Sequence, residues 1–351
     1  MEKGAVEDVV VVGGGIVGMA VAAELGRRGH GVRVLERSAA AAATGSSKGT
    51  ARFRQLADYP DESFLDLGIR AREIWGDMET VAGERIFRRT GNLSIGDAAD
   101  LTKLTQGLRS RNLPVEEVAG GDMPRRWPHL RVRADDVLFQ PDGEVIAADV
   151  AYRAMVAISA SRGVSVVRGV TVVGVDQRPD RLSVLTSQGP VEAARVVLAP
   201  GPWVAGLAAS VGLELDVHVS CQTVAWFEVP ADVVASTPTV TQWSEREPYL
   251  LPDGRRLKAA EHERGPERDP DDQGSIDHTS VERLRAFVAG LFVVPLPHVA
   301  ETDTCLYTNA PGDRIVIETS ERVVAVSACS GQGFQYAPAV AALVSDVVEA
   351  T

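Results

Sequence analysis

A glycine-rich turn between an apolar run and a helix-period segment limits what this chain can fold into. Residues 9–12 read VVVV, residues 13–18 read GGGIVG, and the pattern MAVAAELGRRG and a second apolar run at residues 32–35 follow. Gly13, Gly15 and Gly18 thus satisfy GxGxxG where a strand passes into a helix. They permit a tight turn, a close approach of the backbone to a pyrophosphate, and close packing of the helix on the strand. The segment predicts a βαβ unit that binds a dinucleotide.

An acidic residue ends the second strand of this unit. Glu36 follows Gly18 by 18 residues, where a carboxylate accepts hydrogen bonds from the ribose hydroxyls of a dinucleotide. The same charge repels a ribose phosphate and disfavours NADP. The motif alone leaves FAD, NAD and a glycine turn without a ligand as alternatives.

The length of the chain predicts two lobes, because 351 residues exceed the size at which one hydrophobic core stops growing. We expect an α/β (α+β) fold with a Rossmann-type dinucleotide-binding domain and a second, mainly antiparallel-sheet domain for the substrate. Periodicity places residues 1–85, 145–212 and 299–351 in the first domain and residues 86–144 and 213–298 in the second. It also predicts helices at residues 64–79, 148–162 and 337–349, and polar loops at residues 43–55 and 329–338.

Charge and cysteine usage exclude several classes of function. A net charge of −12 disfavours nucleic acid as a partner. Cys221, Cys305 and Cys329 form no CxxC pair, and the six histidines show no HExxH spacing, so we assign no metal. The sequence contains no GxSxG elbow, so a hydrolase has no support. Without a membrane-length apolar run or a signal peptide, we expect a cytoplasmic protein with no membrane partner.

Four further segments carry a resemblance to a known family. They read GSSKGTAR at residues 45–52, LAPGPW at 198–203, DTCLYT at 303–308 and SGQGFQYAP at 330–338. In order and spacing they resemble the monomeric sarcosine oxidase and N-methyl amino acid oxidase family, within the D-amino-acid oxidase-like FAD-dependent oxidoreductases. The resemblance implies FAD as the cofactor, covalently attached through Cys305. A thiolate is a strong nucleophile and suits such a bond, whereas the alternative for an isolated cysteine is a small buried hydrophobe.

The motif and the resemblance together imply a set of residues around the cofactor. These are Gly13, Gly15, Ile16, Val17, Gly18, Glu36, Arg37, Ser46, Ser47, Lys48, Gly49, Val172, Gly201, Trp203, Cys305, Gly331, Gly333, Phe334 and Gln335.

The resemblance also implies three catalytic residues. Arg52 matches the family arginine near the flavin ring, Lys258 the lysine that promotes reaction with oxygen, and His262 an active-site histidine. A fixed positive charge stabilises superoxide formed beside reduced flavin, so Lys258 favours an oxidase over a dehydrogenase. The alternative is that Lys258 and His262 belong to a solvated, charged stretch.

The substrate positions depart from the family pattern. Members that bind amino acids clamp the substrate carboxylate with an arginine and a lysine, and the matching positions here are Gln55, beside Arg54, and Gln335. Arg54, Gln335 and Tyr249 are therefore the predicted substrate residues, and Trp243 is a further candidate for the pocket; the alternative for both aromatic residues is plain core.

The predicted reaction oxidises a C–N bond of a secondary amine, an N-methyl amino acid or a cyclic imine, and reduces O2 to hydrogen peroxide. A specialised, biosynthetic substrate is favoured over sarcosine because of the changed clamp positions. The alternatives are an FAD-dependent dehydrogenase that passes electrons to a quinone or carrier, and an NAD-binding dehydrogenase or non-catalytic dinucleotide-binding module. The expected partners are a small-molecule amine and molecular oxygen, and the expected state is a monomer or small homo-oligomer.

Overall fold

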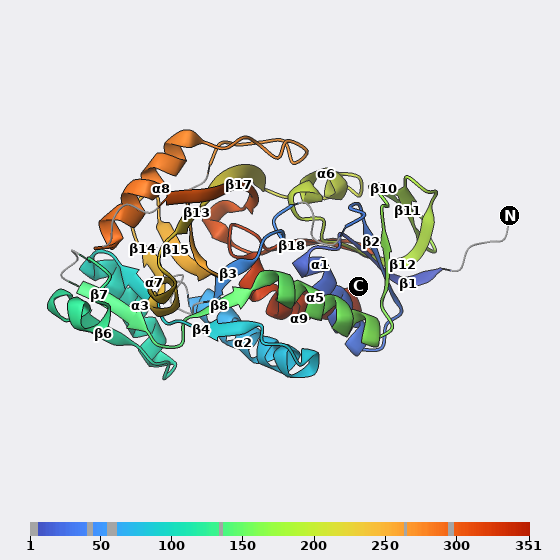
Figure 1. The fold of residues 1–351 in the computed structure, drawn as a ribbon. Coiled ribbons are helices and arrows are strands. Elements are labelled where there is room, and N and C mark those ends of the chain that lie inside the picture. Colours follow the sequence, from blue (N-terminus) through green and yellow to red (C-terminus); the bar gives the residue numbers. More distant parts are fainter. Residues whose placement is uncertain (1–5, 41–44, 55–61, 133–135, 263–264, 294–297) are drawn as a thin grey trace.

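The computed structural model describes residues 6–351 except 41–44, 55–61, 133–135, 263–264 and 294–297. In this part of the chain, two eight-stranded sheets and one three-stranded sheet form the framework. Figure 1 shows the first sheet and its helices on the right and the second sheet on the left. The predicted α/β class, with a Rossmann-type unit and a second, mainly antiparallel sheet, is confirmed.

The first sheet has the order β10-β11-β12-β1-β2-β9, and β19 and β18 continue from β12. Its core, β9-β2-β1-β12-β19, is parallel, as the βαβ reading of the amino-terminal segment predicts. The strands are β1 (Glu7–Val12), β2 (Val32–Glu36), β9 (Ser165–Arg168), β10 (Val172–Gln177), β11 (Leu182–Thr186), β12 (Val191–Leu198), β18 (Val316–Ser320) and β19 (Val323–Ser327).

Both faces of this sheet are covered, which explains why β1 is an unbroken apolar run. Val9 and Val11 belong to a core shared with four helices, whereas Val10 and Val12 face a second core shared with β10, β11 and α6 (Val204–Ala209). Strands of a parallel sheet that are buried on both faces lose the alternation of apolar and polar residues.

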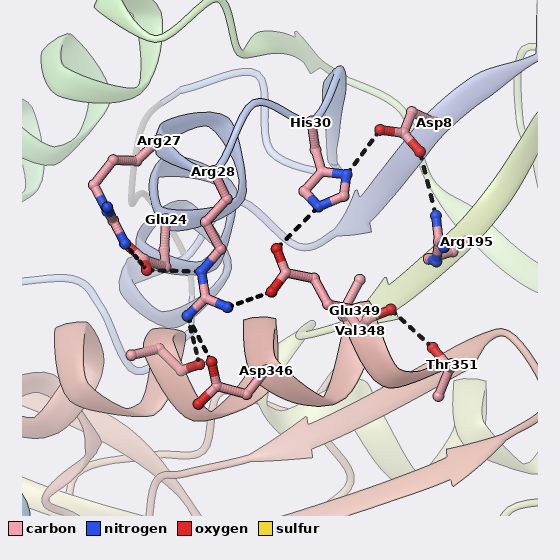
Figure 2. Close-up of polar contacts among 11 residues, drawn as sticks. Asp8, Glu24, Arg27, Arg28, His30, Arg195, Asp346, Val348, Glu349 and Thr351 are labelled. Atoms are coloured by element: carbon pink, nitrogen blue, oxygen red, sulfur yellow. Dashed lines mark hydrogen bonds and ion pairs between the residues drawn. The ribbon is translucent and has the colours of Figure 1, made fainter.

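Four helices pack against one another on one side of the first sheet (Figure 1). They are α1 (Ile16–Arg27), α2 (Glu62–Ala82), α5 (Ala148–Ser161) and α9 (Gly333–Ala350). A polar network ties the end of α9 to α1 and β1 (Figure 2). Arg28 contacts Glu24 at 2.9 Å, Asp346 at 2.8 Å and Glu349 at 2.7 Å.

The second sheet has the order β17-β13-β16-β15-β14-β5-β7-β6 and is antiparallel except between β14 and β5. Its strands are β5 (Asn92–Ile95), β6 (Glu116–Ala119), β7 (Asp136–Gln140), β13 (His218–Glu228), β14 (Thr239–Gln242), β15 (Pro248–Asp253), β16 (Arg256–Glu261) and β17 (His298–Asn309). A small third sheet contains β3 (Ala51–Arg54), β8 (Glu144–Ala147) and β4 (Phe87–Arg89). The remaining helices are α3 (Ala98–Ser110), α4 (Met123–Arg126), α7 (Ala231–Ser236) and α8 (His278–Leu291), with short 3-10 turns at Gly120–Asp122, Gly201–Trp203 and Pro311–Asp313.

Two sequence expectations differ from the structure. Residues 299–309 were expected in the first domain, but β17 pairs along its length with β13 in the second sheet, so that Cys305 lies opposite Gln222. The late glycine segment was expected as a loop to residue 338, but α9 begins at Gly333. A Cβ at Gly333 would lie 1.8 Å from the Ala328 carbonyl oxygen, so the missing side chain permits the helix to start against that backbone. The division of the whole chain into two domains stays a prediction.

Candidate functional site

A cavity of about 510 Å³ lies at the carboxyl ends of the parallel strands and is closed by one face of the second sheet. Ligands of open α/β sheets bind at this edge. All of the predicted cofactor-binding and catalytic residues except Gly18 line it. Gly18 has the predicted packing role instead, because a Cβ there would lie 1.9 Å from the Gly13 carbonyl oxygen.

The glycine turn forms a close-fitting cradle at one end of the cavity. Gly13 has a φ of +103°, and a Cβ at this residue would lie 2.4 Å from the Ala199 carbonyl oxygen. Helix α1 starts at the cavity, where the Ile16 amide donates to Ser47 Oγ at 3.0 Å. Backbone amides at a helix start attract phosphate oxygens. This arrangement fits the pyrophosphate of a dinucleotide.

The carboxylate of Glu36 lies beside this cradle. Its Oε2 accepts from the Gly14 amide at 2.6 Å, and its Oε1 accepts from the Ser38 amide at 2.7 Å. Two backbone donors hold the carboxylate at the end of β2, where it lines the cavity. This is the position from which an acid binds the ribose of a dinucleotide.

Polar contacts close the outer rim of the nucleotide end. The Arg37 guanidinium lies 3.9 Å from the Trp203 ring centroid. Asp271, from the connection between β16 and α8, accepts from Arg37 Nη1 at 2.7 Å and from Trp203 Nε1 at 2.8 Å. Hydrogen bonds from Arg37, then Trp203, lower the pKa of Asp271.

The segment of residues 45–52 crosses the middle of the cavity and is fixed at several points. Arg52 donates to the carbonyl oxygens of Ser46 at 3.0 Å, Lys48 at 2.6 Å and Ala51 at 2.8 Å. Ser46 Oγ donates to the Leu306 carbonyl oxygen at 2.6 Å, and Lys48 pairs with Asp303 at 2.9 Å. These bonds tie the segment to β17, the strand that carries Cys305.

The opposing wall is one face of the second sheet. Alternate residues of its strands point the same way, and this face carries side chains from β13, β15, β16 and β17. They are Val224, Trp226, Tyr249, Leu251, Lys258, Asp303, Cys305 and Tyr307. Cys305 is partly exposed to the cavity, whereas Cys221 is outside the lining residues. Burial raises the pKa of Cys221 and of Cys329.

Lys258 is a buried cation on this wall, with an exposed fraction of 6%. Its Nζ donates to the Ala51 carbonyl oxygen at 2.9 Å. Burial, and next the positive charge of Arg52, lower the pKa of Lys258 to about 7. The predicted catalytic lysine is therefore a desolvated side chain and does not lie on a solvated, charged surface.

His262 and two tyrosines meet around the late glycine segment. The His262 and Tyr307 rings are 5.8 Å apart, and the Tyr307 hydroxyl shares a hydrogen bond with Tyr249. Burial, and next the charge of an ionised Tyr249, raise the pKa of Tyr307. Gly331 has a φ of +79°, and a Cβ there would lie 2.4 Å from the Tyr307 ring and 2.5 Å from the His262 ring.

The predicted substrate residues are only partly brought together. Tyr249 and Gln335 line the cavity, but Arg54 does not. Arg54 is 7% exposed, pairs with Glu144 on β8, and lies 4.3 Å from the Phe87 ring centroid. Burial, and next the charge of Arg72, lower the pKa of Arg54 to about 10. Strand β3 therefore directs Arg54 away from the cavity, which contradicts its proposed contact with the substrate.

Two further candidates from the sequence have separate outcomes. Trp243 packs in a small core with Leu65 and Leu101, so the plain-core alternative holds for it. Gln55 lies outside the described residues. The sequence reasoning missed Trp226, Asp271 and Tyr307. Trp226 and Tyr307 come from strands that are distant along the chain, and Asp271 lies in the connection between β16 and α8. Only the place of Tyr307 two residues after Cys305, on the same strand face, was a usable signal.

The described residues yield two negative findings. In that part of the chain, no group of three His, Cys, Asp or Glu side chains could hold a metal ion. No helix among the same residues is long and apolar enough to cross a membrane.

The fold and the cavity define a class of protein. A dinucleotide cradle on a parallel sheet faces a wall with a thiol and a buried lysine, which is an arrangement suited to a nucleotide-dependent oxidoreductase. The chain belongs to the FAD dependent oxidoreductase family, whose sequence profile matches residues 8–347. It is an FAD-dependent oxidoreductase similar to the amine and amino acid oxidases of that family.

Two curated relatives illustrate the similarity. Monomeric sarcosine oxidase of Bacillus sp. (strain B-0618) is 24% identical over 356 residues, which cover 97% of this chain and 91% of the relative. N-methyl-L-tryptophan oxidase of Salmonella arizonae is 24% identical over 352 residues, which cover 97% and 94%. The resemblance stated from the sequence is thereby confirmed.

Solved structures share the fold. NikD, described as an unusual amino acid oxidase essential for nikkomycin biosynthesis, superimposes in its open form with a TM-score of 0.84 at 24% identity, over 97% of this chain and 93% of that chain. L-proline dehydrogenase from P. horikoshii gives a TM-score of 0.85 at 20% identity, over 98% and 93%. The fold is thus common to proteins named as oxidases and to one named as a dehydrogenase.

Proposed function

We propose that this protein is an amine oxidase that carries FAD covalently at Cys305 and reduces O2 to hydrogen peroxide. One observation carries the proposal: the glycine cradle, the Cys305 thiol and the buried Lys258 line a single cavity. The substrate is a secondary amine, an N-methyl amino acid or a cyclic imine, held between the segment of residues 45–52 and the wall of the second sheet.

The residues that would hold FAD are distributed along the whole cavity. Gly13, Gly15 and the Ile16 amide would meet the pyrophosphate, and Glu36 the ribose. Cys305 would bond through sulfur to the 8α-methyl of the flavin, near Arg52. When bound, FAD would supply the redox chemistry, which is hydride acceptance from the carbon beside the amine nitrogen and transfer of electrons to O2.

The side chains of the wall supply what the amine and oxygen need. The amine reacts as the neutral base, and desolvation among Arg52, Lys258 and His262 disfavours its protonated form. Lys258 places a positive charge where oxygen becomes anionic, without the strong hydration of a surface lysine. No side chain has to act as a strong base, and the imine product is hydrolysed after release.

The charges of the cavity favour a substrate without a free carboxylate. Among the described lining residues, the lysines and arginines are Arg37, Lys48, Arg52 and Lys258. Each already has a protein partner: a carboxylate for Arg37 and Lys48, and backbone carbonyl oxygens for Arg52 and Lys258. Gln335 offers a neutral hydrogen-bonding group, which does not replace the charge of a carboxylate clamp. We therefore propose a specialised amine or a carboxyl-masked amino acid as the substrate.

The test combines the colour of the protein with its product. We expect purified protein to be yellow, to keep its flavin on acid precipitation, and to release flavin under the same treatment when Cys305→Ser is introduced, with Cys329→Ser as the matched control. Amine-dependent peroxide formation across N-methyl amino acids, cyclic imines and carboxyl-blocked analogues should exceed reduction of a dye acceptor. Efficient dye reduction with no oxygen uptake would identify a dehydrogenase instead.

A further inference from the structure

Asp253 connects the second sheet to the segment that leads into β3, beside Trp226 of the cavity wall. Its Oδ2 accepts from Thr50 Oγ1 at 2.7 Å and from Trp226 Nε1 at 2.7 Å. Thr50 precedes β3, whereas Trp226 and Asp253 belong to β13 and β15 of the second sheet. Two donors from separate parts of the chain thus hold one carboxylate oxygen in place.

The Trp226 indole separates two cations on one face of β16. Lys258 Nζ and Arg256 Cζ each lie 5.6 Å from the ring centroid, within the range of cation–π attraction. Arg256 is neutralised by Glu301 at 2.7 Å, at the exposed rim. Lys258 has no such carboxylate partner among the described residues, and Trp226 is only 6% exposed, so the ring shields Lys258 from water on this side.

Charged groups on three neighbouring strands affect the protonation of Lys258, and β13, which also packs against β16, contributes the neutral Trp226. Arg52 on β3 opposes its protonation, whereas Cys305 and Asp303 on β17 and Asp253 on β15 favour it. Asp303 is itself neutralised by Lys48. Cys305 contributes only as a thiolate, and the proposed thioether carries no charge.

Asp253 differs from these groups because it forms no ion pair within 4.0 Å among the described residues. Arg256 lies opposite it on β16 but pairs with Glu301 at 2.7 Å, and Arg88 on β4 donates to the Pro252 carbonyl oxygen at 3.2 Å. The carboxylate of Asp253 is held by neutral donors that fix its position without cancelling its charge. Asp253 is only partly buried, but Lys258 is buried, so the interaction between their charges is screened less by water than that between two surface groups.

We propose that Asp253 is a positioning residue for Lys258: anchored by Thr50 and Trp226, it supplies the negative charge that keeps the buried ammonium protonated and holds the indole against it. The consequence for catalysis rests on the proposed function, because Lys258 is there the group that favours the reaction of oxygen. The effect on the protonation of Lys258 does not depend on it.

The sequence makes a direct measurement practical. Only four lysines occur, Lys3, Lys48, Lys103 and Lys258, so holoenzyme labelled with 13C at the lysine ε-carbon should give four resolvable NMR signals. We expect the signal that disappears in Lys258→Met to have a titration midpoint well below the usual range of a lysine. In Asp253→Asn the titration midpoint of Lys258 should fall further by roughly 0.5–1 pH unit, because the variant removes a negative charge that favours the ammonium. Asp253→Glu, which keeps the charge, should titrate close to the wild type.

Asp271→Asn is the matched control, because Asp271 also accepts from an indole N–H but lies at the nucleotide end of the cavity. An unchanged Lys258 titration in Asp253→Asn, or an equal shift in Asp271→Asn, would overturn the proposal. Should Asp253→Asn fail to fold, Thr50→Val and Trp226→Phe each remove one anchor and should give a smaller downward shift; no shift in either would also overturn it.

Activity is read separately from this titration. We expect Asp253→Asn to lower kcat/KM for O2 about threefold to tenfold above pH 7, while kcat/KM for the amine changes less than about twofold. If the lysine signal shifts and the protein forms no peroxide, the proposed function fails and the role of Asp253 stands. If peroxide forms and the titration of Lys258 does not shift, the role of Asp253 fails and the proposed function stands.

Discussion

Gln335 lies in the first turn of α9 and lines the cavity, with an exposed fraction of 4%. The indole N–H of Trp75, on α2, donates to the backbone carbonyl oxygen of Gln335 at 3.0 Å. This hydrogen bond holds the backbone of Gln335 against α2. A change of side chain should therefore alter the charge of the cavity with little change in the fold. This makes residue 335 the sharpest place to test the preference for a neutral substrate.

We expect Gln335→Lys to raise kcat/KM for amines that carry a free carboxylate by about tenfold or more, because a charge-assisted contact adds on the order of 1.5–3 kcal/mol. The same substitution should lower kcat/KM for carboxyl-blocked analogues. Gln335→Met, similar in length but uncharged, is the control and should not improve turnover of the free acids. Steady-state peroxide formation with matched acid and amide pairs measures the change, and an equal effect on both would contradict it.

Arg54 was a candidate for contact with the substrate, but in the structure it pairs with Glu144 and is expected to stabilise the fold. Because Arg54 and Glu144 are both largely buried, Arg54→Met leaves a carboxylate without its partner and should destabilise the protein by about 3–5 kcal/mol. The double variant with Glu144→Met should recover most of that loss. Denaturant unfolding measures stability, and an altered KM in the folded double variant would restore a role in substrate binding.

Lys258 should make stability depend on pH in flavin-free protein. Its folded pKa of about 7 lies below the ordinary lysine value of 10.5, so the unfolded chain binds more protons between these values and stability rises with pH there. Lys258→Met removes the cost of burying the charge. We expect it to stabilise the protein by about 3–5 kcal/mol at pH 6 and by much less at pH 10. Equal effects at both pH values would show that folding does not shift the pKa of Lys258.

At the scale of the element, the end of α9 depends on one arginine. Arg28, just after α1, bridges Glu24, Asp346 and Glu349, and His30 lies 2.9 Å from Asp8 and 3.3 Å from Glu349 (Figure 2). Burial opposes ionisation of Glu24, but hydrogen bonds from Arg27 and Arg28 lower the pKa of this residue overall. A hydrogen bond from Arg28 lowers the pKa of Glu349.

We expect Arg28→Met to destabilise the protein by about 1–2 kcal/mol at pH 7, since the network is partly exposed and screened by solvent. Lowered carboxylate pKa values stabilise the fold above their unfolded values and lose this effect as pH falls through the folded ones. The difference between variant and wild type should therefore shrink below about pH 4. Thermal unfolding from pH 3 to 8 follows it, and Arg27→Met, which removes only a contact to Glu24, is the milder control.

Elements could be predicted where a local pattern decided them. The run of valines and glycines at residues 9–18 predicted β1 and the start of α1, and residues 148–162 gave α5 within one residue. Residues 299–309 were predicted to belong to the first domain, whereas β17 pairs with β13 in the second sheet. This is a contact across about 80 residues of sequence, which periodicity does not report. The start of α9 was placed late because glycines favour turns, and only the close Ala328 carbonyl oxygen explains a helix there.

For the whole molecule, the nucleotide end of the cavity was more predictable than the substrate end. A dinucleotide site is built from one contiguous βαβ unit, so Gly13, Ile16 and Glu36 could be found together in the sequence. The substrate wall combines side chains from four different strands, namely Trp226, Tyr249, Lys258 and Cys305. Side chains alternate between the two faces of a sheet, so the pairing of these strands decides which of them face the cavity. The resemblance to a family named Lys258 and Cys305 but not Trp226. Direct register gave Gln55, which lies outside the described residues, and its neighbour Arg54 does not line the cavity.

The packing of α9 on α1 has a consequence for how the protein forms. A ribosome releases the amino terminus first, so α1 emerges while its cover, which begins at residue 333, is still to be translated. Until then, the apolar side of α1 and one face of β1 lack part of their final neighbours. We therefore expect nascent chains shorter than about 330 residues to depend on chaperones, and cofactor capture to follow completion of translation.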